Sequence, residues 1–218
     1  ETDSDIGDDS DIMIQDSGIE VEPSQEPAAD EGEKRELENL TRKYNARTPA
    51  ELRLIQDLRT LQRVGEKSLG FRANPIDMKL DHWSVQIFEF DKNTEFFRDM
   101  QKYKKMCGRD YIEMSLSFPP DYPFSPPFAR ILTPRFQYRT GHVTLGGSLC
   151  MDILTSDGWN PMYEISSIIS NIIAQIISGN PRVDLTQATV PYPLSEAKDG
   201  YIRMATQHGW KIPKWLPK

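Results

Sequence analysis

The sixteen residues from Glu164 to Gly179, EISSIISNIIAQIISG, narrow the folds open to this chain more than any other segment. Apolar residues recur at i, i+3, i+4 and i+7 through three turns, which predicts a helix with one apolar face. Gly179 and Pro181 end the pattern, because glycine closes a helix and proline prevents it from resuming. A face made of isoleucine has to be buried, and we expect it to pack against a sheet. Its seven residues are Ile165, Ile168, Ile169, Ile172, Ile173, Ile176 and Ile177.

A second helix is predicted in TPAELRLIQDLRTLQRV, nearer the N-terminus. Thr48 as N-cap, Pro49 at the first helical position and Glu51 three residues after the cap form a capping box. An apolar stripe follows, and arginines occupy the other side. That basic side is either solvated surface or a contact surface for a partner. The stripe consists of Leu52, Leu54, Ile55, Leu58 and Leu61, and the arginines are Arg53, Arg59 and Arg63.

Three strands are predicted within residues 78–90, 110–118 and 128–136, where β-branched and aromatic residues partly alternate with polar ones. Residues 91–108 are too long for a hairpin turn, so we interpret them as an insertion with a short, solvated helix. Cys107 lies there, and we assign it no role. A last helix is expected near Ser195. This order predicts an α+β domain: an antiparallel meander sheet flanked by an N-terminal helix, a central buried helix and C-terminal helices.

Five prolines in FPPDYPFSPPF, residues 118–128, separate the second and third predicted strands. Proline cannot donate to a sheet ladder or sit inside a helix, so this segment is stiff. It is either a proline-rich ligand for another protein or a rigid connector. The interleaved Tyr122, Phe124 and Phe128 favour a packed connector.

The net charge of −7 is unevenly distributed. Residues 1–36 hold fourteen acidic and two basic side chains, a net charge of −12, and the remainder carries +5. We therefore divide the chain into an acidic disordered tail, residues 1–36, and a folded domain, residues 37–218. Within the tail, Ile12, Met13 and Ile14 stand among acids. They are either solvated or able to add a strand to a small modifier protein such as SUMO.

Cysteine and histidine usage argues against several classes of protein. Cys107 and Cys150 form no C-x-x-C pair, and the three histidines show no ligand spacing, so we expect no metal and no cofactor. The start lacks the features of a secretory signal, and no run of about 18 apolar residues suggests a membrane span. We expect a cytoplasmic or nuclear protein without disulfides. The absence of an initiator methionine suggests a fragment of a longer chain.

The segment GGSLCMDIL raises the question of what Cys150 does. By itself, an isolated cysteine is more often a packed small hydrophobe than a nucleophile.

Four motifs in register resemble the ubiquitin-conjugating enzyme domain. The family typically has YPFKPP, a glycine three residues before the active cysteine in ICLDIL, WSP, and a helix followed by NP. The matching segments here are YPFSPP, Gly147 before Cys150, WNP from Trp159 to Pro161, and Asn180-Pro181. The spacings match except for one extra residue between Cys150 and Trp159. The resemblance is strong from about Pro49 to Asp184 and looser beyond.

The sequence is most similar to the Q-type branch of this family. The link between the family's second and third strands is replaced by the longer FFRDMQKYKKMCGRDYIEMSLSF, and PPFARIL follows the prolines. GHVTLGGSLCM and ILTSDGW stand where most relatives have a His-Pro-Asn tripeptide and a shorter link to tryptophan. Q-type domains can end longer chains, in some cases after an ADP-ribosyltransferase module.

The resemblance implies that Cys150 accepts ubiquitin from an activating enzyme as a thioester and passes it to an acceptor. Thiolate is both a good nucleophile and a good leaving group, so the first step requires no strongly perturbed base. His142 stands where relatives have the tripeptide's asparagine. It is a candidate oxyanion donor, general base or structural brace, or else a plain surface histidine.

Relatives often place an acid just after NP, where this chain has Val183, and Asp184 follows one residue later. Asp184 could serve in orienting the acceptor if the loop shifts. Because both usual residues are altered, transfer to a hydroxyl rather than a lysine stays open. His208 could approach the site, as a late-chain histidine does in the Q-type branch, or simply end a helix.

The expected partners are ubiquitin, its activating enzyme, a ubiquitin ligase and a protein substrate. The resemblance places the shared enzyme surface on Arg53, Phe124, Asn160, Pro161 and Met162. No nucleic-acid motif accompanies the modest basic patch, and the acidic tail would repel phosphates. The rival reading is a non-catalytic module that binds ubiquitin or a ligase. A hydrolase using Cys150 and His142 is disfavoured because no third orienting residue is evident.

Overall fold

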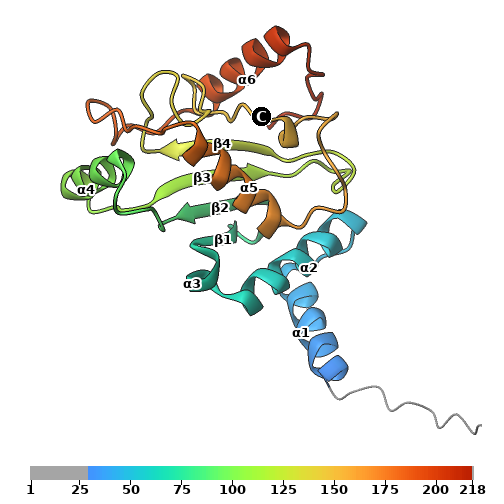
Figure 1. The fold of residues 1–218 in the computed structure, drawn as a ribbon. Coiled ribbons are helices and arrows are strands. Elements are labelled where there is room, and N and C mark those ends of the chain that lie inside the picture. Colours follow the sequence, from blue (N-terminus) through green and yellow to red (C-terminus); the bar gives the residue numbers. More distant parts are fainter. Residues whose placement is uncertain (1–28, 218) are drawn as a thin grey trace, which may run out of the picture.

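The computed structural model describes residues 29–217. Its centre is a four-stranded antiparallel sheet in the order β1-β2-β3-β4, so each strand pairs with the next along the chain (Figure 1). The strands are β1 (Phe71–Ile76), β2 (Lys79–Ile87), β3 (Ile112–Ser117) and β4 (Phe128–Thr133). The predicted meander and α+β class are confirmed, and β1 is an addition that the sequence reading lacked. The tail residues Ile12, Met13 and Ile14 lie outside the described residues.

The isoleucine helix is α5 (Ile165–Ser178), and it packs on the sheet as predicted. Five of its isoleucines are buried: Ile165, Ile168, Ile169, Ile172 and Ile176. Ile173 is half-buried and Ile177 is 41% exposed, so the buried face is narrower than the seven residues predicted. The exposed end of α5 lies beside the loops that carry Cys150.

The predicted N-terminal helix is α2 (Pro49–Val64), with the full capping box between Thr48 and Glu51. Leu52, placed in the apolar stripe from its spacing, is 42% exposed, because the buried face centres on Leu54, Ile55, Leu58 and Leu61. The predicted tail boundary at residue 36 falls inside a helix. Helix α1 (Ala29–Tyr44) begins earlier and packs on α2.

The contact between α1 and α2 uses charges that looked solvated in the sequence. Arg59 and Arg63 both pair with Glu33 of α1, and Leu40 packs into the core. Two of the three arginines on the basic side of α2 are therefore occupied by α1.

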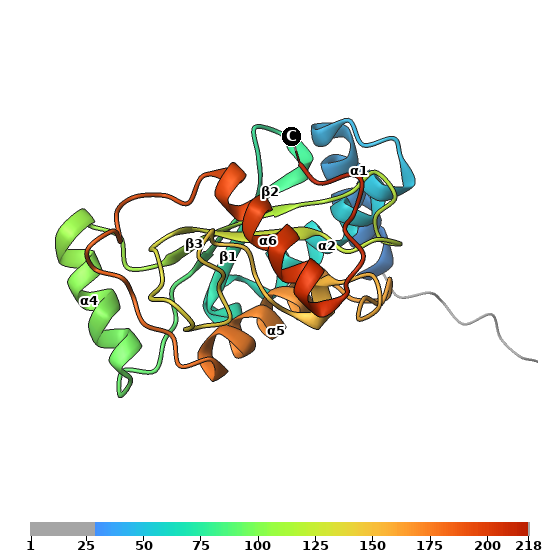
Figure 2. The same ribbon diagram turned by 90° about the horizontal axis from the view of Figure 1, so that it is seen from above.

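Three further helices complete the domain. The short α3 (Glu66–Leu69) precedes β1, and α4 (Glu95–Cys107) is the predicted insertion helix. Phe96, Met100 and Tyr103 of α4 are buried, so this helix is anchored rather than merely solvated. Helix α6 (Leu194–His208), expected near Ser195, lies beyond the β4 edge of the sheet (Figures 1 and 2). No helix within residues 29–217 is long and apolar enough to cross a membrane.

The proline segment is a packed connector, as the sequence favoured. Tyr122 is buried with its ring 4.9 Å from that of Phe118 and 6.2 Å from that of Trp159. Phe124, in contrast, points outward and is 77% exposed.

Candidate active site

Cys150 ends a tight hairpin-like turn that starts at His142. The Cys150 amide donates to the carbonyl of His142 over 3.0 Å, and the Thr144 amide donates to the carbonyl of Ser148 over 2.9 Å. Val143 and Leu149 form an isolated antiparallel bridge between them. A short ladder therefore holds the backbone of Cys150 and His142 side by side.

Two glycines let the rest of the chain approach this turn. A Cβ on Gly146 would lie 1.9 Å from the carbonyl oxygen of Glu196, in the first turn of α6. A Cβ on Gly147, whose φ is +89°, would lie 2.6 Å from the ring of Tyr192. No side chain fits at such distances, so these positions require glycine for α6 and the segment before it to dock.

The docked α6 forms one wall of a groove of about 600 Å³ that contains Cys150. Loop residues 138–145 and the end of α5 form the other walls. Cys150 is half-buried and packs against a cluster of buried residues that includes Phe128, Tyr201 and Met204. Other residues lining this thiol groove include His142, Leu145, Ser178, Asn180, Arg203 and His208.

Burial raises the pKa of the Cys150 thiol, and the negative charge of Asp152 raises it further. The thiolate is therefore less populated here than for a free cysteine at neutral pH. In the described residues, Cys150 forms no disulfide. The same range contains no cluster of three or more His, Cys, Asp or Glu side chains that could hold a metal ion.

His142 reaches the site mainly through its backbone. It adopts a left-handed φ of +53°, and its carbonyl accepts the Cys150 amide. The exposed ring of His142 lies over Gly179, because a Cβ added to that glycine would be 2.8 Å from Cδ2 of the ring. The geometry brings His142 and Cys150 together in one groove. A catalytic role for the His142 ring stays a prediction.

Asp184 is not among the residues that line the thiol groove. Its Oδ1 accepts from the Thr186 amide over 3.0 Å and from the Thr186 hydroxyl over 2.5 Å. Val183, which takes the place of the family's usual acid, is fully buried and bridges to Phe136. The structure therefore does not bring Asp184 to the thiol.

His208 does line the thiol groove. Its ring stacks on Trp210 with centroids 4.8 Å apart, and it ends α6 at the left-handed Gly209. Asn180 also lines the groove. From the sequence it was noted only as part of the NP motif. Its amide side chain could have been considered from the sequence, because it directly follows the helix end at Gly179.

Two apolar side chains of the predicted partner surface are largely exposed to solvent. Phe124 is 77% and Met162 is 80% exposed. Their loops are tied together, because the Trp159 indole donates to the carbonyl of Pro123 over 2.6 Å. Asn160 accepts the Met162 amide through Oδ1 and is itself exposed beside Pro161.

We expected the Arg53 side chain to be an exposed contact for a partner, but its guanidinium is engaged by groups of this chain. Its guanidinium donates to the carbonyls of Pro161 and Tyr163 over 3.2 and 2.7 Å. It also pairs with Asp57 over 3.1 Å. Sequence position could not show the contacts with Pro161 and Tyr163, because those two residues lie more than 100 residues away. Arg53 thus braces the loop that presents Asn160, Pro161 and Met162.

Asp57, the partner of Arg53, is buried. Burial raises the pKa of its carboxyl, and the positive charge of Arg53 offsets part of that rise. Asp57 also accepts from the Tyr122 hydroxyl over 3.3 Å and from the Ile165 amide over 3.4 Å. One carboxylate therefore links α2, the proline segment and the start of α5.

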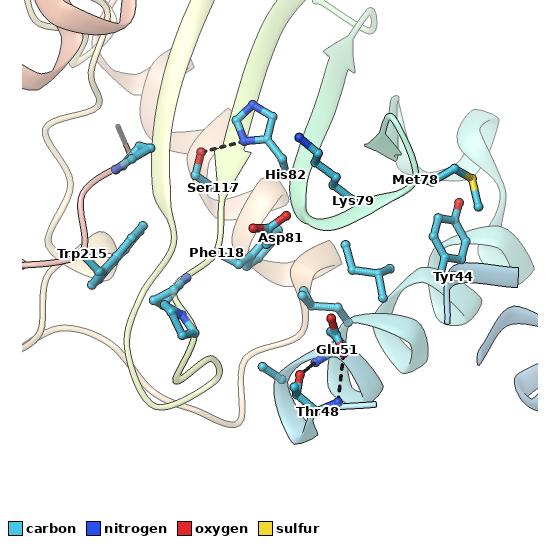
Figure 3. A pocket seen from close by; sticks show the side chains of 16 residues that line it. Tyr44, Thr48, Glu51, Met78, Lys79, Asp81, His82, Ser117, Phe118 and Trp215 are labelled. Atoms are coloured by element: carbon cyan, nitrogen blue, oxygen red, sulfur yellow. Dashed lines mark hydrogen bonds between the residues drawn. The ribbon is translucent and has the colours of Figure 1, made fainter. Parts of the chain in front are cut away.

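A second groove, of about 650 Å³, lies between the α1–α2 junction, the β1–β2 turn and the C-terminal segment (Figure 3). Its histidine, His82, bonds to the Ser117 hydroxyl through Nδ1 over 2.9 Å, and burial lowers the pKa of the His82 ring. Trp215 and Tyr44 stand at opposite sides of this groove (Figure 3). Neither cysteine lines it, so it is not the thiol site.

The fold and the thiol groove define a class of protein: a small α+β domain with a half-buried cysteine in a surface groove. The pattern of the ubiquitin-conjugating enzyme family matches residues 53–207, and the chain belongs to that family.

Curated relatives place the chain near the Q-type branch. Ubiquitin-conjugating enzyme E2 Q1 of Mus musculus is 31% identical over 165 residues, covering 74% of this chain and 39% of that protein. Ubiquitin-conjugating enzyme E2 25 of Caenorhabditis elegans is 28% identical over 182 residues, covering 81% of this chain and 46% of that protein. The chain thus spans less than half the length of each of these two relatives.

A solved structure of human ubiquitin-conjugating enzyme E2 G1 is 25% identical, with a TM-score of 0.46. That match covers 59% of this chain and 95% of the other.

Proposed function

We propose that this domain accepts ubiquitin from an activating enzyme as a Cys150 thioester and transfers it to a lysine of a protein substrate or to a ligase. The observation that carries the proposal is the half-buried thiol of Cys150, which opens into a groove instead of the core. The motifs around Cys150 and the family membership support the same role.

In the first step, the Cys150 thiolate attacks the carbonyl carbon of the activating enzyme's thioester. The new carbon–sulfur bond forms as the thiolate of the activating enzyme leaves, and the proton of Cys150 goes to solvent. The raised pKa of Cys150 lowers the thiolate fraction but also makes the thiolate more nucleophilic. Exchange between similar thiols is nearly thermoneutral, so positioning in the groove matters more than a lowered pKa.

In the second step, an acceptor amine attacks the carbonyl carbon of the Cys150 thioester. The carbon–nitrogen bond forms, the bond to Cys150 Sγ breaks as the thiolate leaves, and the amine proton goes to solvent. The oxyanion that develops on the way needs a hydrogen-bond donor. Several side chains of the thiol groove carry suitable donors, among them His142, Asn180 and His208. His142 is our candidate, because its backbone is already tied to Cys150. Asp184 has no part in this scheme while its carboxylate is bonded to Thr186. A hydroxyl group stays the alternative acceptor to a lysine amine.

The partner surface consists of Phe124, Met162 and the residues beside them. Exposed aromatic and methionine side chains suit a contact with the activating enzyme and with a ligase. Arg53 supports this surface from beneath. A free thiol used as a carrier suits a reducing compartment, so we place the protein in the cytoplasm or nucleus.

The test is an incubation of the protein with ubiquitin, activating enzyme and ATP. We expect an adduct that a reducing thiol removes, and a reductant-resistant ester with Cys150→Ser. A wild type that stays unmodified would favour the rival reading, a non-catalytic module that only binds ubiquitin or a ligase.

His142 is tested separately with single-turnover discharge of the thioester onto free lysine. His142→Ala should charge normally and discharge about 100-fold more slowly, as expected for loss of an oxyanion donor worth about 3 kcal/mol. His142→Asn should restore most of the rate, because asparagine tolerates the left-handed backbone and donates a hydrogen bond. Equal discharge by all three proteins would reduce His142 to a backbone brace.

A further inference from the structure

A third hollow, of about 500 Å³, lies where the connection from β2 to α4 meets the end of α5. Its floor is apolar. Phe90 and Phe96 meet edge to face with centroids 5.1 Å apart, and Pro181 lies beside them. Ile177, the exposed isoleucine of α5, completes the floor. We call this hollow the acidic cleft because of the side chains on its rim.

The rim carries three exposed carboxylates, Glu89, Asp91 and Glu95. The basic residue among the lining residues is Arg182, and its guanidinium is engaged by Asp99 at 2.6 and 3.3 Å. Glu95 pairs with the neighbouring Arg98. Within residues 29–217, Glu89 and Asp91 have no ion-pair partner. The cleft therefore keeps a net negative rim above an apolar floor.

The acidic cleft adjoins the thiol groove. Asn180 lines both hollows, and Ile177 of the cleft is followed directly by Ser178 of the groove. The chain that leaves α5 then runs past α4 (Figures 1 and 2). An extended peptide advances about 3.3 Å per residue, so a few residues suffice to cross a ridge of one side chain.

The usual acid for an incoming lysine is missing on this side of the site, because Val183 is buried. We propose that the acidic cleft binds a basic segment of the acceptor protein, in which lysine or arginine alternates with apolar residues. The cationic heads would face Glu89 and Asp91, and the apolar residues and side-chain stems would cover Phe90 and Ile177. This inference rests on the proposed function, since it names the substrate class of that reaction.

The binding test uses uncharged protein and a fluorescein-labelled heptapeptide of alternating lysine and leucine. Fluorescence polarisation should show saturable binding that weakens with salt, and a matched peptide with glutamate for lysine should not bind. Glu89→Lys should weaken binding about fivefold, as expected when one surface ion pair becomes a repulsion. Ile177→Ser should also weaken it. Glu38→Lys, an equal charge reversal on exposed α1, is the matched control and should bind like the wild type.

The same heptapeptide then serves as acceptor in the discharge assay. Glu89→Lys should slow discharge onto the peptide and leave discharge onto free lysine unchanged. Wild-type affinity in both cleft variants, or equal binding of the glutamate peptide, would overturn the proposal. Because the binding test needs no thioester, it decides the role of the cleft even if the proposed conjugation fails.

Discussion

The two cysteines of this chain are both half-buried and free, yet their surroundings shift their thiols in opposite directions. Burial and Asp152 raise the pKa of Cys150. Burial also opposes ionisation of Cys107, but hydrogen bonds and charge from Arg109 outweigh it and lower the pKa of that thiol. The cysteine better activated for simple nucleophilic attack is therefore not the one that we assign to catalysis.

What distinguishes Cys150 is the groove that it lines and not its acidity. Cys107 ends α4, where its Sγ donates to the Tyr103 carbonyl over 3.5 Å, and neither the thiol groove nor the acidic cleft includes it. Cys150 faces a groove built from three segments. A cysteine that carries a large acyl group needs room beside the thiol for the tail of that group. The pKa of the thiol is a secondary requirement.

The largest effect is expected for Gly146→Ala. The new Cβ would meet the Glu196 carbonyl of α6, so the helix has to shift away from the Cys150 turn. We expect a loss of about 3 kcal/mol or more in the free energy of unfolding. Alkylation of Cys150 should speed up severalfold while that of Cys107 stays unchanged, as measured by peptide-resolved mass spectrometry.

The matched control for this change is Gly32→Ala. Gly32 lies in α1 with no atom within 4 Å of an added Cβ, so the substitution should be neutral or slightly stabilising. Equal unfolding curves for the two variants would contradict the docking role of Gly146.

A smaller, severalfold effect is expected in the pH profile of alkylation by iodoacetamide. Thiols react as thiolates, so the lowered pKa of Cys107 predicts that its rate rises and levels off at lower pH than the rate of Cys150. Arg109→Gln should move the Cys107 profile to higher pH and narrow the gap. Indistinguishable profiles in the wild type would show that Arg109 does not activate Cys107.

The smallest effect is expected for Asp152→Asn. Removing this charge leaves burial as the remaining cause of the raised pKa, so the Cys150 profile should shift slightly to lower pH. We expect about a twofold rise in the alkylation rate at neutral pH, within the range of one partly screened charge. Asp157→Asn, in the same loop, is the control. A slower reaction in Asp152→Asn would reverse the sign that we assign to this charge.

Much of the fold could be predicted from local patterns. The spacing of isoleucines identified α5, and the capping box of Thr48 and Glu51 identified the start of α2, because both patterns lie within one element. The six residues FRANPI of β1 were missed, since Asn74 and Pro75 are unusual in strands. Residues 29–36, the first half of α1, were assigned to the tail, because this stretch is highly charged and the ion pairs that Glu33 makes with α2 are tertiary.

Of the site, only the residues that belong to family motifs could be predicted from the sequence. The family motifs placed Cys150 and His142 in one loop, and the structure joins them through a backbone hydrogen bond. Side-chain direction is not encoded in spacing, so Arg53 was expected at the surface and Asp184 near the thiol. Remote carbonyls engage Arg53, and the neighbouring Thr186 engages Asp184.

Intact-mass analysis after incubation with ubiquitin, activating enzyme and ATP compares the two thiols directly. We predict one thiol-labile ubiquitin on the wild type and on Cys107→Ala, and none on Cys150→Ala. A labile ubiquitin that persists in Cys150→Ala and disappears in Cys107→Ala would contradict the view that the groove at Cys150, and not acidity, selects the carrier.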